Sequence, residues 1–236
     1  MILIKKGNEP EVLQKLREKC IEEGLTAEQA YKRLRGKRKD KVRDFLMRDQ
    51  SGLCAYCMCR IPRNDVPDKI SPIVIEHFMP RNPENGVQAG QGLDYQNLFL
   101  VCHGNRAPKG VHKISDLTCD AHRGNKAFRK IHPGKQETLE TIKYLTDGKI
   151  DADDPDVRYD LVEILNLNCP SSSLVSERKA VLDGLIDEMV ELDLMDLELK
   201  DFLEKRLEFF ENESGTKTEY VGVLIWYLKS LIKELA

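Results

Sequence analysis

Apolar residues recur at helical spacing in the first fifty residues of the chain. The positions that define this pattern are Val12, Leu13, Leu16, Val42, Phe45 and Leu46. Gly52 follows the second set closely, and a glycine just beyond an apolar stripe is typical of the end of a helix. We therefore expect helices between about Glu9 and Gln50.

The composition changes from Ser51 to about Lys130, where cysteine, histidine, proline, glycine and asparagine are frequent. Two short runs, 73–75 and 98–101, have the apolar, partly β-branched composition of strands. The segment has little apolar content per residue, so packing alone is not expected to hold it together. A bound metal commonly stabilises such a segment.

Helical periodicity returns after the acidic, turn-rich stretch 147–156 and continues to the last residue. The repeating apolar positions are Leu161, Ile164, Leu165, Leu182, Leu185, Ile186, Met189, Leu224, Leu228, Leu231, Ile232 and Leu235. A polar connector, 213–218, separates the last two expected helices. Further apolar residues crowd this third of the chain: Leu192, Leu194, Met195, Leu197, Leu199, Ile225, Trp226 and Tyr227. A small bundle would bury some of them, and we expect the rest to form an exposed patch that binds a protein.

These patterns predict an α+β protein that is mostly helical and has three parts. They are a basic N-terminal helical segment (1–50), a zinc-stapled central module (51–150) and an acidic C-terminal helical domain (151–236). No run approaches the roughly 18 apolar residues of a membrane helix, and the first residues lack the apolar run of a signal peptide. We expect a cytoplasmic protein that does not associate with membranes.

Charge is divided unevenly along the chain, although the formal total is only −3. The three parts carry +5, +4 and −12, so the acidic third would repel a polyanion that the first two could bind. Eight basic residues and one acidic residue lie between Lys32 and Arg43. We expect this run to contact phosphates through Lys32, Arg33, Arg35, Lys37, Arg38 and Lys39; a solvated helix face is the alternative.

Seven cysteines in a reducing compartment favour metal binding over disulfides. Cys54 and Cys57 form a CxxC motif, whose spacing suits two thiolate ligands of one ion, and Cys102 and Cys119 complete a four-cysteine zinc site. Cys59 is a possible substitute ligand. We interpret Cys20 and Cys169 as small apolar residues in helical segments.

Two chemically active residues, Glu76 and His77, end the β-type run IVIEH and precede Pro80. Asn97 follows in the sequence YQNL, and the segment CDAHRGNK begins at Cys119. The order of these motifs resembles the HNH, or ββα-metal, nucleases, over about residues 50–130. It is similar to the HNH nucleases that accompany an ATPase in Septu and retron-linked antiphage systems.

The resemblance implies a metal-dependent endonuclease that hydrolyses phosphodiester bonds of DNA or RNA. His77 would be the general base, Glu76 a ligand of a catalytic Mg²⁺ or Mn²⁺, and Asn97 the residue that holds the loop bearing His77. Asp120, His122 and Asn125 are candidates for the third position of the motif, with His122 or Asn125 preferred; Asn105 and His103 lie outside that segment. The implied partner is an ATPase of the same operon, alone or with a reverse transcriptase and its nucleic-acid product.

Two other functions fit part of the pattern. A non-catalytic zinc module could dock nucleic acid or protein and use Glu76 and His77 structurally. A zinc-dependent deaminase would need an HxE motif followed by PCxxC, and that order is absent from the sequence.

Overall fold

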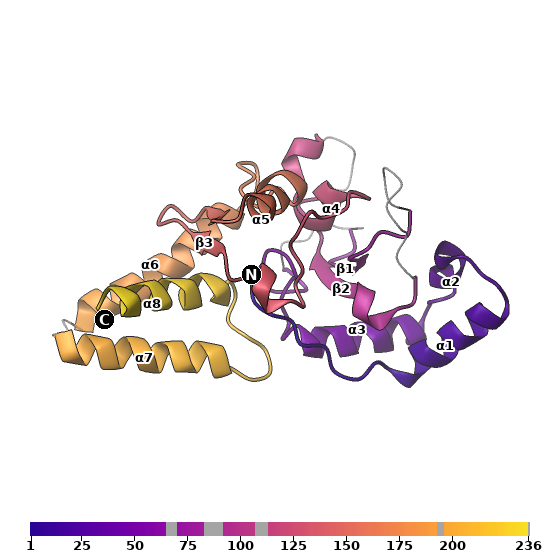
Figure 1. Ribbon diagram of the computed structural model, residues 1–236, viewed down its shortest axis with the longest axis horizontal. Helices are drawn as coiled ribbons and strands as arrows, with labels where there is room; N and C mark the ends of the chain where they lie inside the picture. Colours follow the sequence, from indigo (N-terminus) through magenta and orange to yellow (C-terminus); the bar gives the residue numbers. More distant parts are fainter. Residues whose placement is uncertain (65–69, 83–91, 107–112, 193–195, 236) are drawn as a thin grey trace.

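A computed structural model describes residues 1–64, 70–82, 92–106, 113–192 and 196–235. Figure 1 shows helices α1–α3 at one end of the molecule, the β1–β2 hairpin and α4 in the middle, and α6–α8 at the other end. The fold is α+β and about half helical, so the α+β prediction is confirmed, whereas helices do not dominate as strongly as expected. In the described part of the chain, no helix is both long and apolar enough to cross a membrane.

The N-terminal segment forms three helices rather than one continuous stretch. They are α1 (Glu11–Glu22), α2 (Ala27–Lys32) and α3 (Lys37–Asp49). Thr26 caps α2 by accepting a hydrogen bond from the backbone of Gln29. Leu13 and Leu16 face the core as expected, but Val12 is 37% exposed and lies outside the buried face.

The central hairpin pairs β1 (Ile73–His77) with β2 (Leu98–Cys102) in antiparallel register. His77 lies opposite Leu98, and a 3-10 turn (Tyr95–Asn97) leads into β2. The side-chain amide of Gln50, at the end of α3, bonds to the backbone of Leu100. Its Nε2 donates to the carbonyl oxygen of Leu100, and its Oε1 accepts from the backbone N–H of Leu100. Since both strands coincide with the predicted β-type runs, the sequence located this hairpin correctly. The short helix α4 (Cys119–Arg123) follows it in the chain.

A second hairpin, which the sequence analysis did not predict, pairs β3 (Ile142–Tyr144) with β4 (Ile150–Ala152). The expected division at residue 150 therefore falls inside β4. After it come α5 (Pro155–Tyr159) and a turn of π-helix (Asp160–Ile164). Cys169 is buried, but it lies in the turns that precede α6 and not in a helix as expected.

Three longer helices complete the chain: α6 (Leu174–Leu192), α7 (Asp196–Asn212) and α8 (Val221–Glu234). Helix α8 packs on both α6 and α7, and Leu182, Leu203 and Leu228 are fully buried between them. The predicted connector 213–218 separates α7 from α8. Leu194 and Met195 lie outside the described residues.

Candidate metal centre and catalytic site

The first two cysteines of the predicted zinc site lie on a tight backbone loop after α3. The amide of Cys54 bonds to the carbonyl of Cys59 at 2.9 Å, and the amide of Met58 bonds back to the carbonyl of Cys54 at 3.1 Å. Met58 has a φ of 67°, in the left-handed region, which tightens the turn. The loop is anchored on the hairpin because the amide of Ala55 donates to Leu100.

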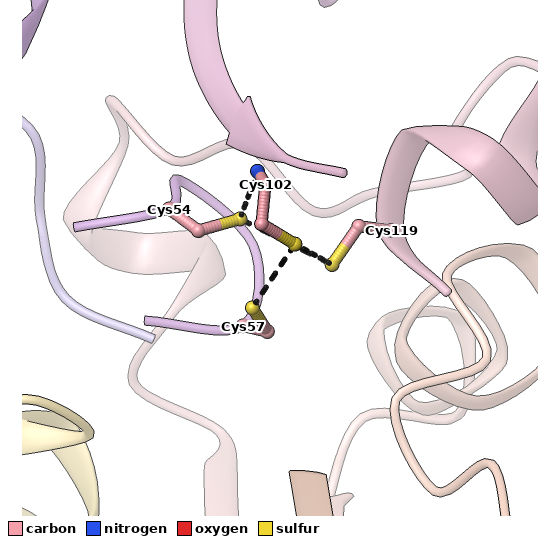
Figure 2. Close-up of side chains that lie close together, drawn as sticks. All are labelled: Cys54, Cys57, Cys102 and Cys119. Atoms are coloured by element: carbon pink, nitrogen blue, oxygen red, sulfur yellow. Dashed lines mark hydrogen bonds between the residues drawn. The ribbon is translucent and has the colours of Figure 1, made fainter. Parts of the chain in front are cut away.

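Four sulfur atoms converge on one point, as Figure 2 shows. The Sγ atom of Cys102 lies 3.8 Å from that of Cys57 and 3.7 Å from that of Cys119, and Cys54 Sγ lies 4.0 Å from Cys119 Sγ. A tetrahedral zinc with Zn–S bonds of about 2.3 Å separates its sulfurs by roughly 3.8 Å. The buried cluster of Cys54, Cys57, Cys102 and Cys119 therefore has the spacing that a metal such as zinc requires.

One backbone amide reaches the sulfur cluster. The amide of Cys102 donates to Cys54 Sγ at 3.4 Å, an interaction that stabilises negative charge on sulfur. Gly104 lets α4 approach: a Cβ there would lie 2.4 Å from the carbonyl oxygen of Thr118. Cys59 is also buried, but it is not part of the four-cysteine cluster found in the described residues.

Glu76 is buried and pairs with Arg123, the last residue of α4. Arg123 Nη1 donates to Glu76 Oε1, and the hydroxyl of Tyr56 lies 3.4 Å from the same oxygen. The guanidinium also donates to the carbonyls of His77 and Phe78, so it fixes the backbone just after β1. Arg123 was not among the predicted site residues, since a buried arginine in the polar segment CDAHRGNK has no distinctive signal.

A second carboxylate, that of Asp120, also contacts Glu76. Burial raises the pKa of Glu76 well above its ordinary value, and the charge of Asp120 adds to the rise while Arg123 opposes it. Asp120 in turn accepts from Arg106 Nη2 at 3.3 Å. Two adjoining carboxylates in a poorly solvated place would be relieved by a proton or by a divalent cation.

The imidazole of His77 is held in one tautomer. Its Nε2 lies 3.0 Å from the carbonyl oxygen of Gly92, which can only accept, so Nε2 carries the hydrogen and Nδ1 has the free electron pair. Gly92 is required there, because a Cβ would lie 2.0 Å from the carbonyl oxygen of Ala27. Burial lowers the pKa of His77 to about 4, so the ring is neutral at pH 7.

Asn97 connects the start of β2 to the loop after His77. Its Oδ1 accepts from the amide of Met79 at 2.7 Å, and its Nδ2 donates to the carbonyl of Met79 at 3.0 Å. The backbone carbonyl of Asn97 also accepts from the amide of Phe78 at 2.9 Å. These three bonds fix the direction in which the chain leaves β1.

The three candidates for the third position differ in their surroundings. Asp120 contacts Glu76 and acts electrostatically on His77. His122 instead places Nδ1 2.9 Å from the carbonyl oxygen of Ile164, in the π-helical turn. Asn125 is exposed beyond the end of α4. The two residues outside the segment CDAHRGNK also differ. His103 is buried, and the side chain of Asn105 donates to the carbonyl of Asp116.

The basic run divides at the turn between α2 and α3. Its first half makes local contacts: Lys32 pairs with Glu28 and Arg33 with Glu23, while Arg35 bonds the carbonyl of Lys32. Lys37 and Arg38 are exposed at the start of α3. Lys39 lies over the ring of Tyr31, 5.9 Å from its centroid, and Tyr31 contacts His77 edge-on at 4.6 Å.

In comparisons with known proteins, no protein-family model matches this chain and no curated protein is significantly similar to it. The residues of the site therefore carry the functional argument by themselves.

Proposed function

We propose that the four-cysteine cluster binds one structural zinc ion, with Cys54, Cys57, Cys102 and Cys119 as its ligands. The sulfur separations fit a tetrahedral ion, and all four thiols are buried. Zinc bound there would join the loop after α3, the end of β2 and the start of α4. These are the elements on which Glu76, His77 and Asp120 depend for their placement.

We further propose that the chain is a metal-dependent endonuclease of the HNH type, which hydrolyses phosphodiester bonds in DNA or RNA. A Mg²⁺ or Mn²⁺ ion held by Glu76 and Asp120 would polarise the scissile phosphate. Nδ1 of neutral His77 accepts a proton from the attacking water, and Asn97 fixes the backbone that presents His77. In this proposal Asp120, rather than His122 or Asn125, takes the third position.

One set of contacts carries this proposal: Asp120 adjoins Glu76 and also acts electrostatically on the neutral imidazole of His77, whose Nδ1 is free. Adjoining carboxylates match the oxygen ligands that hard divalent ions prefer, and the lone pair on Nδ1 matches the need for a base. The order strand, strand, short helix of β1, β2 and α4 agrees with the architecture that the resemblance implies.

The proposal is tested by incubating the zinc-loaded protein with end-labelled DNA and RNA, with and without Mg²⁺ or Mn²⁺. We expect cleavage that requires the added divalent ion. The reaction without added divalent ion serves as the control. Zinc content is measured in parallel, so that loss of the structural zinc is not mistaken for loss of the catalytic ion. Absence of divalent-dependent cleavage of either nucleic acid would contradict the proposal.

The ion pair between Arg123 and Glu76 favours a second candidate, a non-catalytic zinc module. Arg123 already neutralises part of the charge that a cation would need, and Glu76 could serve only to anchor α4 on β1. In that case the protein would bind nucleic acid or protein without cutting, and the cleavage assay separates the two functions.

We propose that α6–α8 bind a protein partner, such as the ATPase of a Septu-like or retron-linked antiphage system, alone or with a reverse transcriptase and its nucleic-acid product. Val190 on α6 and Phe209 on α7 are 72% and 53% exposed, and residues 151–236 carry a charge of −12. Co-expression with an ATPase of such a system should give a complex that Val190→Asp with Phe209→Asp disrupts. Co-purification unaffected by both substitutions would contradict this surface.

A further inference from the structure

Several cationic side chains gather around Tyr31, on the side of the molecule where α2 meets the loop after β1. The guanidinium of Arg81 lies 4.5 Å from the centroid of the Tyr31 ring, and Lys39 Nζ lies 5.9 Å from it. Arg43 is near enough to act electrostatically on both Tyr31 and Lys39. Asn82 donates to Glu28 on α2, which fixes the loop that carries Arg81.

The protein compensates the charge of these cations only in part. Among the described residues, no carboxylate forms an ion pair with Arg81, although Glu28 acts on it electrostatically, and Arg43 pairs with Asp40 at 3.7 Å. Nε of Arg43 is buried and has no hydrogen-bond partner within that part of the chain. Burial lowers the pKa of Lys39, and the charge of Arg43 lowers it further. A bound anion would stabilise such a partly compensated group of cations.

The cluster adjoins the candidate catalytic site. Tyr31 packs its ring edge-on against His77, with the centroids 4.6 Å apart, and Arg81 acts electrostatically on the His77 ring. An anion bound between Arg81 and Arg43 would therefore lie beside the imidazole, on the side of Tyr31. The exposed members of the basic run, Lys37 and Arg38, belong to the first turn of α3.

We propose that Arg81 and Arg43, with Lys39, bind a backbone phosphate of the nucleic-acid strand next to the phosphate that is cleaved. This assignment rests on the proposed function, because it places the substrate relative to His77. The planar guanidinium groups can donate two parallel hydrogen bonds to one phosphate, whereas Lys39 contributes charge. Tyr31 positions Arg81 and Lys39 through its ring and does not itself bind the strand.

The test measures binding of the full-length, zinc-loaded protein to a labelled single strand of about 20 nucleotides, as DNA and as RNA, without divalent ions. Arg43→Gln combined with Arg81→Gln should weaken binding and raise the Kd at least tenfold. The slope of log Kd against log salt should fall by about 0.7, the contribution of one phosphate contact on a single strand. The matched control, Lys37→Gln with Arg38→Gln, should change the Kd less than threefold. Arg43→Lys with Arg81→Lys keeps the charge and controls for folding.

Equal weakening by the two pairs, or wild-type binding by the Arg43/Arg81 variant, would overturn the inference, as would failure of the wild type to bind at low salt. Because binding is measured without cleavage, the result is separate from the nuclease proposal. Loss of binding in the arginine variant of a protein that never cleaves supports the phosphate site and contradicts the nuclease. Cleavage by the wild type together with unchanged binding in the arginine variant supports the nuclease and contradicts the phosphate site.

Discussion

Arg123 at the end of α4 forms a buried ion pair with Glu76 near the end of β1. The same guanidinium donates to the carbonyls of His77 and Phe78, and it lies 4.1 Å from the centroid of the Phe128 ring. One side chain thus joins the hairpin to the helix that follows the last cysteine. The positions of Glu76, His77 and Asp120 relative to one another depend on this contact.

Arg123→Met should lower the free energy of unfolding by about 3–5 kcal/mol, because it leaves Glu76 buried without its cation. The double variant Arg123→Met with Glu76→Met removes both charges and should recover part of that loss. Urea unfolding of the wild type, both single variants and the double variant measures the coupling. Additive losses in the double variant would mean that the two residues do not support each other.

Replacing Cys57 by Ser should release the bound zinc and unfold the centre of the chain, since the ion would join the loop after α3 to β2 and α4. Cys169→Ala is the matched control, because Cys169 is buried but lies outside the cluster. Elemental analysis of the purified proteins should find about one zinc per chain in the wild type and in the control. A folded wild-type protein without zinc would contradict the assignment.

Asp120→Asn should raise the concentration of Mg²⁺ or Mn²⁺ needed for half-maximal cleavage, because it removes one of the two charges that face the ion. His122→Ala should leave that concentration nearly unchanged, since His122 is engaged with Ile164. Metal titrations of the cleavage rate compare the two variants. A larger effect from His122→Ala would assign the third position to the histidine.

Glu177 on α6 supplies a pH-dependent contribution to stability. Burial would raise the pKa of this carboxyl, but hydrogen bonds from Arg63 and Tyr220 lower it to about 2. A carboxyl with a depressed pKa stabilises the fold above its unfolded pKa of about 4.5, and the contribution is lost as the pH falls from about 4.5 to about 2. Because the side chain is 31% exposed, solvent screening reduces the contribution to roughly 1–2 kcal/mol.

Glu177→Gln should therefore destabilise the protein at pH 7 and have progressively less effect below pH 4.5. Glu163→Gln, in the π-helical turn Asp160–Ile164, is the comparison variant for the loss of one carboxylate. Chemical denaturation from pH 7 to pH 3 follows the difference between wild type and variant. A difference that stays constant across this range would mean that the charge of Glu177 does not contribute.

The sequence identified the features whose residue types are distinctive. Runs of apolar, partly β-branched residues located β1 and β2, and the chemistry of cysteine identified the four residues that the fold brings together. The β3–β4 hairpin was missed because its strands have three residues each and lie in a charged, turn-rich segment. Short strands are held by their neighbours, so their own sequence carries little signal.

Other parts of the site depend on geometry that a linear sequence does not contain. Cys119 has a φ of 52° at the start of α4, and this conformation helps to decide which side chains of the short helix face Glu76. Spacing alone could not choose among Asp120, His122 and Asn125. Likewise, Arg81 approaches Tyr31 only because α2 packs on the loop after β1.

The central claim is that Nδ1 of His77 accepts a proton from the water that attacks a metal-bound phosphodiester. The most direct measurement is the single-turnover cleavage rate of His77→Gly with Mn²⁺, with and without added imidazole. We predict a loss of at least 100-fold with zinc content and oligonucleotide binding unchanged, and partial recovery of the rate as imidazole is added. Cleavage by His77→Gly within a few-fold of the wild-type rate would contradict the account.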